Sequence, residues 1–361
     1  MILKKLVVYP YHDELSPFLR LQSVVSGFEK IIPVSPRGFG FADRDAGICD
    51  GGLPTGVTVL SELKAALSQC DSVFFDRAIN SSLDYNHYLS MIQTALDMGK
   101  EVIITKSLLM TLPQSSIDQL KIRVIGYSLE SPPEIRHKKL FDIPIPCVTV
   151  LGTGDKSNKF EVQIAIADYF KSHGYNTCLL GTKEYTEMFG FEPLPEFLFI
   201  ESNQRDKILK FNHYIYQKVI NGNYDIIIIG CPGGIMPDNP FIFLDYGELP
   251  IVIGTALQAD TSVLCTYAAP LNEIAVTFLQ NLCKYKLNAE VRRISLACKD
   301  MTIDQATMEL KYITLDSQFV KHKIMPTPAP NNCELYIGLL PEDENRLAKS
   351  IETELLNNVG G

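Results

Sequence analysis

The chain has few histidines and no spacing of residues that would hold a metal. Six histidines are spread over 361 residues, and none of them forms an H-x-x-x-H pattern with acidic residues beside it. Zinc catalysis needs three ligands that converge on one ion and leave a coordination position open. We therefore expect no metal site in this protein, either structural or catalytic.

Paired cysteine spacings and a serine nucleophile motif are also missing. Nine cysteines occur, at positions 49, 70, 147, 178, 231, 265, 283, 298 and 333, and no two of them form C-x-x-C. This odd, unpaired set and the lack of a secretory signal at the N-terminus indicate a reducing compartment, so we expect a cytoplasmic protein. No G-x-S-x-G motif occurs, and Cys231 has no recognisable base beside it. Serine or cysteine nucleophilic catalysis is therefore not expected.

Clusters of basic residues and long apolar runs are lacking as well. The formal net charge is −9, and no group of lysines and arginines offsets it locally. Nucleic-acid binding needs a basic surface that neutralises phosphates, so we expect no nucleic-acid partner. No apolar run reaches the roughly 20 residues of a membrane-spanning helix, so we expect no membrane segment. The hydrophobic content of 46% and charged content of 21% are those of a globular protein with a large core.

Apolar strand-like runs alternate with segments of helical period along almost the whole chain. This alternation predicts an α/β protein with mostly parallel sheets. We interpret residues 1–135 as a Rossmann-like domain whose ligand crevice, if it has one, follows the carboxyl ends of its strands. Strands are predicted at 6–9, 57–60, 72–75, 101–105 and 121–127, with helices at 61–69 and 85–98 between them. A polar, glycine-rich stretch at 36–55 is either a mobile lid or a packed loop.

The segment 128–146 contains four prolines and no periodicity, so it marks the boundary between two domains. The second domain is predicted at 136–325 and resembles a P-loop NTPase in its order of elements. Its strands are expected at 148–152, 176–180, 226–229, 262–267 and 290–296, and its helices at 159–172, 206–220 and 271–285. Residues 326–361 begin with a proline-rich linker and continue as a strand and a helix, which we expect to pack on the second domain.

Residues 147–163, CVTVLGTGDKSNKFEVQ, predict a phosphate-binding loop. A β-branched run ends in a Gly-Thr-Gly turn, a short polar loop follows, and a lysine opens a helical segment. The amides of such a turn and of a helix N-terminus face one point and favour an anion, to which the lysine adds a mobile positive charge. We expect ATP or GTP to be the cofactor and its contacts to be Gly152, Thr153, Gly154, Asp155, Lys156, Ser157, Asn158, Lys159, Phe160 and Glu161.

This loop departs from the pattern G-x-x-x-x-G-K-[ST] on both sides of its lysine. Asn158 stands where the pattern has glycine, and Phe160 stands where a hydroxyl would bind magnesium. Asparagine tolerates a left-handed backbone, so the loop can still form. A second magnesium ligand is also lacking. The strand at 226–229 is followed by Gly230, where many P-loop proteins have aspartate. These losses argue against efficient hydrolysis more strongly than against binding.

Two further segments are expected to lie beside the loop. Thr182 and Glu184 follow the second strand of this domain, and Gly230, Gly233 and Gly234 form a tight turn after a fully apolar strand. Glycines in such a turn allow a ligand or a neighbouring backbone to approach closely. The alternatives are a solvated turn at 182–184 and a glycine pair that only relieves crowding at a strand end.

Taken together, these motifs resemble a P-loop family of the dethiobiotin-synthetase-like (SIMIBI) kind. Its members carry G-T-x-x-x-x-G-K-F-T-x-Q, then R-G-Y, then a G-T-E motif. This chain has G-T-G-D-K-S-N-K-F-E-V-Q, H-G-Y and G-T-K-E in the same order. With its opening V-V-Y-P-Y-H-D-E-L-S-P-F and the segment G-C-P-G-G-I-M-P, the whole chain looks most like the peptide maturation system proteins, encoded beside clostridial ribosomal peptide precursors and a radical SAM enzyme.

The resemblance implies an accessory protein in the maturation of a ribosomal, bacteriocin-like peptide. Its partners would be the precursor peptide, the radical SAM maturase or both, and Lys159 would be the loop lysine of a degenerate P-loop with weak or no NTP hydrolysis. The alternative is an NTP-dependent ligase or kinase in which Glu161, or an acid from 182–187, replaces the usual metal ligands. A sheet edge that pairs with a peptide or with a second copy would give a peptide complex or a homodimer.

Overall fold

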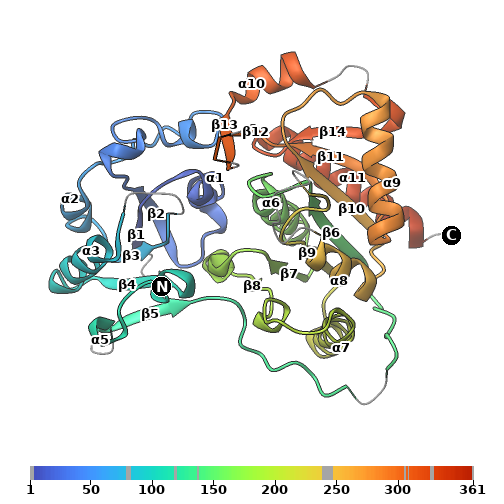
Figure 1. Ribbon diagram of the computed structural model, residues 1–361, viewed down its shortest axis with the longest axis horizontal. Coiled ribbons are helices and arrows are strands. Elements are labelled where there is room, and N and C mark those ends of the chain that lie inside the picture. The colour runs from blue at the N-terminus through green and yellow to red at the C-terminus, as the bar shows by residue number, and fades with distance from the viewer. Residues whose placement is uncertain are drawn as a thin grey trace. The chain divides into compact units, whose positions relative to one another are not determined.

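The computed structural model describes residues 4–78, 83–117, 120–135, 138–237, 247–304, 306–307, 309–325 and 329–359. The chain forms two compact units, each built on a parallel sheet (Figure 1). The first unit comprises Met1–Tyr127 together with Lys183–Gly190, and the second comprises Ser128–Thr182 together with Phe191–Gly361. Two parallel α/β sheets confirm the predicted fold class. The predicted linker at 326–330 lies mostly outside the described residues.

The first unit has a five-stranded sheet in the order β2-β1-β3-β4-β5, with every pair parallel. Its strands are β1 (Lys4–Tyr9), β2 (Phe28–Pro33), β3 (Ser72–Phe75), β4 (Glu101–Thr105) and β5 (Ile122–Ile125). Its α-helices are α1 (Pro17–Arg20), α2 (Leu63–Leu67), α3 (Tyr85–Asp97), α4 (Lys106–Leu109) and α5 (Gln114–Ile117). Short 3₁₀ helices are η1 (Asp13–Leu15), η2 (Gln22–Val24), η3 (Arg37–Phe39), η4 (Ala46–Cys49) and η5 (Glu184–Phe189).

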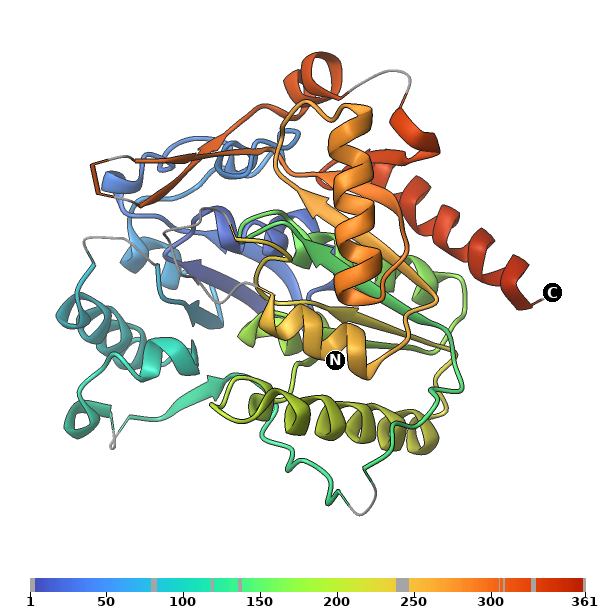
Figure 2. The ribbon, with the colours of Figure 1, turned by 45° about the vertical axis from the view of Figure 1, so that its right-hand side comes forward.

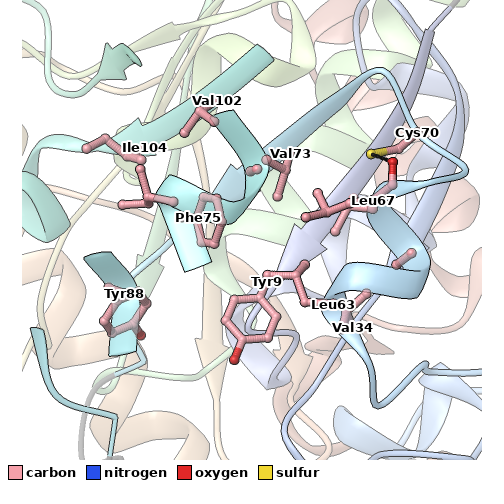
Figure 3. Close-up of a cluster of buried hydrophobic side chains, with 14 of the residues drawn as sticks. Tyr9, Val34, Leu63, Leu67, Cys70, Val73, Phe75, Tyr88, Val102 and Ile104 are labelled. Atoms are coloured by element: carbon pink, nitrogen blue, oxygen red, sulfur yellow. Dashed lines mark hydrogen bonds between the residues drawn. The ribbon is translucent and has the colours of Figure 1, made fainter. Parts of the chain in front are cut away.

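Successive side chains of a strand point to opposite sides of the sheet, so each side presents apolar residues. Other elements of the unit cover both sides. On one face, side chains of α2 and α3 pack on alternate residues of β1, β3 and β4 (Figure 3); this cluster includes Leu63, Leu67, Tyr88, Ile92, Val7, Val73, Phe75, Val102 and Ile104. On the other face, the ring of Phe74 lies 5.2 Å from Phe18 and 5.9 Å from Tyr185. The η5 segment therefore completes the core of the first unit, although it follows β7 of the second in the chain.

The predicted strand at 57–60 is wrong. Thr58 and Leu60 form only isolated bridges with Asp45 and Val34, because their partners are single loop residues and not a neighbouring strand. The adjoining stretch 36–55 is held by its own side chains. The Asp45 carboxylate accepts bonds from the amides of Gly47, Thr55 and Gly56 at 2.8 to 2.9 Å. This supports a packed loop over a mobile lid.

The second unit has a seven-stranded parallel sheet in the order β14-β11-β10-β6-β9-β7-β8. Its strands are β6 (Cys147–Gly152), β7 (Thr177–Gly181), β8 (Glu192–Pro193), β9 (Ile226–Gly230), β10 (Thr261–Thr266), β11 (Val291–Leu296) and β14 (Glu334–Ile337). Its α-helices are α6 (Lys159–Ser172), α7 (Gln204–Gly222), α8 (Glu248–Ala256), α9 (Glu273–Leu287), α10 (Ser317–Phe319) and α11 (Pro341–Val359). Smaller elements are the antiparallel hairpin β12 (Lys299–Ile303) and β13 (Leu310–Thr314), η6 (Glu196–Leu198), the π-helical turn η7 (Val320–Ile324) and η8 (Pro330–Asn332).

Helices cover both faces of this sheet as well. The α6 and α11 helices pack together on one face, and α8 and α9 lie on the other (Figures 1 and 2). Strand β6 lies in the middle of the sheet, between β10 and β9, so the loop that follows it sits at the centre of the carboxyl edge. Throughout the described part of the chain, every helix is too short or too polar to span a lipid bilayer.

Side-chain contacts on β14 and a proline on β8 protect the edges of the seven-stranded sheet. On β14, the Arg346 guanidinium donates to the Leu335 carbonyl at 2.9 Å, and the Asp343 carboxylate accepts from the Ile337 amide at 2.9 Å. On the opposite side, β8 is only two residues long and contains Pro193, which has no amide to donate. Occupied backbone groups and a proline disfavour the addition of another strand.

The buried Arg293 side chain ties β11 to α11 and gives a testable pH dependence. It is 3% exposed and bonds to the Glu354 carboxylate and to the Ser350 hydroxyl. Burial raises the pKa of Glu354, but hydrogen bonds from Arg293 and Thr261 outweigh this effect and leave the pKa below its ordinary value of 4.5. Ionised Glu354 therefore stabilises the fold above about pH 4.5, and this contribution is lost as the pH falls through the lower folded value.

We expect Glu354→Gln to lower the free energy of unfolding at pH 7 and to flatten its decline in acid. Urea unfolding between pH 7 and pH 3 should show the gap between wild type and variant narrowing towards low pH. Glu201→Gln, a change at an exposed position, is the matched control and should run parallel to wild type. A gap that stays constant with pH would contradict the role assigned to this carboxylate.

Candidate functional site

The loop between β6 and α6 is held in place by the neighbouring strand β10. The Thr153 amide donates to the Cys265 carbonyl at 2.9 Å, and the hydroxyls of Thr153 and Thr266 are 3.2 Å apart. Further along, the Tyr267 hydroxyl donates to the carbonyl of Asp155 at 2.7 Å. The start and the outer part of the loop are thus both tied to the end of β10.

The loop folds back on itself in the way a phosphate-binding loop requires. The Ser157 hydroxyl donates to the Gly154 carbonyl at 2.9 Å, and Asn158 takes a left-handed backbone with φ 59°. This is the conformation that the sequence analysis required of an asparagine in place of glycine. Gly152 is needed for close approach, because a Cβ there would lie 2.6 Å from both the Lys159 Cδ and the Ser157 Oγ.

Lys159 closes the loop from inside. Its side chain is almost fully buried, and its ammonium donates to the Gly154 carbonyl at 2.6 Å and to the Gly233 carbonyl at 2.9 Å. The second bond joins the loop to the turn after β9. A lysine ammonium is a compact cation on a flexible stem, and such a group can turn towards an anion that enters the loop.

The two positions that would bind magnesium carry other groups. Phe160 is buried where a serine or threonine would offer a hydroxyl. At Gly230, a Cβ would lie 2.2 to 2.3 Å from the amide atoms of Gln163, so this side chain fills the space that an aspartate would need. Gln163 is completely buried, and its Nε2 lies 3.4 Å from the Thr182 hydroxyl.

Within the described ranges, no three His, Cys, Asp or Glu side chains come together in a way that could hold a metal ion. Glu161 adds a buried carboxylate to the first turn of α6. It shares the neighbourhood of the Cys265 thiol with Lys159: burial raises the pKa of that thiol to about 12, Lys159 lowers it and Glu161 raises it. The loop therefore presents a positive and a negative charge to the same strand end.

Cys231 is buried in the surroundings of an unreactive thiol. Burial raises the pKa of its thiol to about 12, although Lys159 acts in the opposite direction. A thiol that stays protonated at neutral pH and is closed off from solvent is unreactive.

The structure brings most of the predicted second-side residues to the loop. Gly233 binds Lys159, Thr182 and Gly230 surround Gln163, and Gly234 precedes Ile235, whose amide donates to the Gly152 carbonyl at 2.9 Å. Glu184 is placed elsewhere: it belongs to the first unit, where its carboxylate accepts a bond from the Ser107 amide at 3.0 Å.

Gln163, Thr266 and Tyr267 were not predicted from the sequence as site residues. Gln163 follows Lys159 by four residues, which places both side chains on one face of α6, so helical spacing was a usable signal. Thr266 and Tyr267 reach the loop only because β10 pairs with β6. That pairing joins segments more than one hundred residues apart, and no local feature of the sequence predicts it.

Comparison with known proteins supports the fold. No model of a protein family matches the chain, and no curated protein matches it. Among solved structures, the chain is similar to a DUF1611 family protein from Anabaena variabilis ATCC 29413, with a TM-score of 0.57 and 13% identity over 97% of this chain and 99% of that chain. At this identity the likeness shows a shared α/β fold and nothing more.

Two other solved structures align more weakly. An LAO/AO transport system kinase gives a TM-score of 0.32 and 11% identity over 61% of this chain and 63% of that chain. Escherichia coli FolC in complex with DHPP and ADP gives 0.25 and 12% identity over 58% and 53%. Both scores are too low to support an argument about this protein.

Proposed function

We propose that the second unit binds a phosphate-bearing ligand in the loop 152–161 and hydrolyses it weakly or not at all. The observation that carries this proposal is the exchange of both magnesium-binding groups. Phe160 replaces the hydroxyl, and Gln163 occupies the space in front of Gly230. Phosphoryl transfer depends on a metal that neutralises the developing charge, whereas binding of a phosphate does not.

Anion binding is supported by the backbone of the loop. Left-handed residues at Lys156 and Asn158 alternate with right-handed or extended neighbours, which turns successive amides towards one point. The N-terminus of α6 adds the positive end of a helix dipole. The buried Glu161 carboxylate repels a bound phosphate and so opposes the attraction from the loop amides and the helix dipole. The expected affinity for ATP or GTP is therefore weak.

The biological role that we propose is accessory to the maturation of a ribosomal peptide. It rests on the resemblance to peptide maturation system proteins, and the expected partners are the precursor peptide, the radical SAM maturase or both. A binding loop without metal ligands suits a component that senses or carries a ligand while a separate enzyme performs the chemistry. The proposed compartment is the cytoplasm.

One observation keeps an NTP-dependent ligase or kinase as the second candidate. The Oε1 atom of Gln163 is buried and has no hydrogen-bond partner among the described residues. Together with the Glu161 carboxylate, it offers oxygen atoms of the kind that bind Mg²⁺. In that case Lys159 would act beside a metal held by ligands of an unusual type.

Calorimetry with ATP and GTP, each with and without Mg²⁺, separates the two candidates. We expect weak binding of similar strength in both conditions, and no release of phosphate in a parallel assay. Binding that strengthens about tenfold with Mg²⁺ and is accompanied by turnover would establish the enzyme. No binding of either nucleotide or of pyrophosphate at millimolar concentration would overturn the phosphate-loop proposal itself.

The biological role needs its own experiment. The protein, expressed with the precursor peptide that this role implies, should retain that peptide through affinity purification and size exclusion. A peptide with a scrambled sequence is the control. Loss of the native peptide to the same extent as the scrambled one would contradict direct binding.

A further inference from the structure

Three of the four edge strands in the two parallel sheets carry features that disfavour a further strand. Strands β14 and β8 of the seven-stranded sheet have the side-chain contacts and the proline described above. On β2, the Gln22 side chain donates to the Glu29 carbonyl at 3.0 Å. The same strand ends in Pro33, whose carbonyl accepts a bond from the Leu60 amide at 2.9 Å. The fourth edge strand is β5, at the end of the five-stranded sheet (Figure 1).

Strand β5 has an open edge. It pairs in parallel with β4 along one side. Among the described residues, its backbone from Arg123 to Ile125 bonds only within this ladder. The strand contains no proline, the Val124 residue is 42% exposed, and the Arg123 side chain is 54% exposed. Unpaired amides and carbonyls on an exposed edge are a template for another strand.

A groove of about 810 Å³ lies at the start of β4 and β5. Its apolar lining includes Leu96 from α3 and Leu120 and Ile122 from the start of β5. These three side chains pack on the core of the first unit and stay partly exposed. Successive side chains of a strand point to opposite faces, so every second residue of a strand added to β5 would face this apolar lining.

The same groove is basic. The charged residues that line it are three cations and one carboxylate, namely Lys100, Lys121, Arg123 and Glu101. The carboxylate already pairs with the Lys4 ammonium at 2.7 Å. The formal net charge of the chain is −9, so this is a local concentration of positive charge on an acidic protein. The pairing of β4 with β5 brings its members together.

Two of these cations have no carboxylate partner in the part of the chain that the structure describes. Arg123 pairs with Glu187 at 2.7 Å. The Lys100 ammonium instead donates to the Cys70 carbonyl at 2.8 Å, and Lys121 is exposed and forms no ion pair with a described residue. A carboxylate that reaches this groove therefore meets two positive charges that no carboxylate neutralises.

These charges decide between the possible occupants of the edge. A second copy of the chain would bring the same basic groove to the same place, and like charges on paired strands repel. An extended segment that carries carboxylates is attracted instead, and its backbone can pair with β5 at the same time.

We propose that β5 binds an extended acidic segment as a sixth strand, with apolar side chains of the segment in the groove and its carboxylates beside Lys100 and Lys121. The inference rests on the peptide-binding role proposed above and deepens it, since the segment belongs to the precursor peptide. The surface lies wholly in the first unit and is separate from the phosphate loop.

Fluorescence anisotropy of the full-length protein tests the charge of the segment. The probes are two short labelled peptides in which valine alternates either with glutamate or with lysine. We expect the glutamate peptide to bind, the lysine peptide not to bind, and the affinity to fall as the salt concentration rises. Equal behaviour of the two peptides, no binding of the glutamate peptide, or its displacement by pyrophosphate at matched ionic strength would overturn the proposal.

Backbone methylation tests whether the segment pairs as a strand. Alternate amides of an added strand face β5, and the others point away from it. Two forms of the glutamate peptide carry N-methyl groups either on the valines or on the glutamates. One form should lose binding and the other should keep it. Equal binding of the two forms would show that charge alone holds the peptide and would overturn strand addition.

Lys121→Glu tests the groove itself and should weaken binding of the glutamate peptide about tenfold. Lys30→Glu is the matched control, because Lys30 is exposed on β2 at the opposite edge of the same sheet and the change in net charge is equal. The control should bind the peptide as wild type does, and both variants should unfold in urea at the wild-type midpoint. Equal loss of binding in the two variants would overturn the assignment of this surface.

Co-purification with the precursor peptide separates this inference from the role on which it rests. Retention by wild type and loss in Lys121→Glu would support both. Equal retention by the two proteins would leave the role standing and overturn the surface. A precursor peptide that wild type does not retain, while the glutamate probe still binds, would contradict the role and support the edge. A wild-type dimer that Lys121→Glu disrupts would assign the edge to a second copy and overturn the proposal.

Discussion

Replacing Gly230 with aspartate is expected to lower the free energy of unfolding by about 3 kcal/mol or more and not to restore NTP hydrolysis. The new Cβ would lie within 2.3 Å of the Gln163 amide, and Gln163 is completely buried. The carboxylate would also enter a fully buried strand end, where an added charge is costly. Chemical unfolding followed by circular dichroism measures the first effect, and a phosphate-release assay measures the second.

The double variant Gly230→Asp/Gln163→Ala separates steric conflict from the loss of glycine. Because alanine at position 163 makes room, the double variant should recover a large part of the stability that Gly230→Asp alone loses. Coupling of this kind is expected for residues in direct contact. A stable Gly230→Asp protein that hydrolyses ATP with Mg²⁺ would show that Gln163 is no obstacle and would support the ligase or kinase.

Replacing Lys159 with alanine is expected to weaken the binding of ATP or pyrophosphate by about a hundredfold. The substitution removes a buried positive charge from the loop and leaves the carbonyls of Gly154 and Gly233 without that ammonium. The loop would also lose its bond to the turn after β9, so local opening should increase. Calorimetry measures the affinity, and hydrogen exchange over 152–158 and 231–237 measures the opening.

Lys156→Ala is the matched control for this variant. Lys156 lies in the same loop, but it is only half-buried, and its ammonium stands 5.5 Å from the centre of the Tyr312 ring. Its removal lowers the net charge equally and should cost less than about threefold in affinity. Equal losses in the two variants would indicate a general effect of charge and would remove the special role given to Lys159.

The parts of this structure that local chemistry determines were predictable. Buried strands such as 226–229 read directly from their apolar runs, and the left-handed Asn158 followed from what asparagine tolerates. The strand β2 and the hairpin β12–β13 were missed, because charged and polar residues interrupt their apolar pattern. Their stability comes from neighbours, which a single segment does not reveal.

Long-range placement accounts for the remaining differences. Residues 183–190 follow β7 in the chain, yet their aromatic rings complete the core around Phe18 and Phe74 in the first unit. For this reason Glu184 does not lie at the phosphate loop, although its position after β7 in the sequence predicted that it would. The role of Gln163 could not be predicted either, because it depends on Gly230 lying against its side chain in the folded protein.

The protected edges of the seven-stranded sheet limit how any polypeptide can be recognised there. Arg346 and Asp343 occupy main-chain groups on one border and Pro193 lies on the other, so the addition of another strand is disfavoured at both. Selectivity for such a segment must then come from its side chains. Binding should therefore depend on which residues stand at particular positions of the segment, and a shift of the segment by one residue should weaken it. The same contacts disfavour edge-to-edge pairing of this sheet with a second copy of itself.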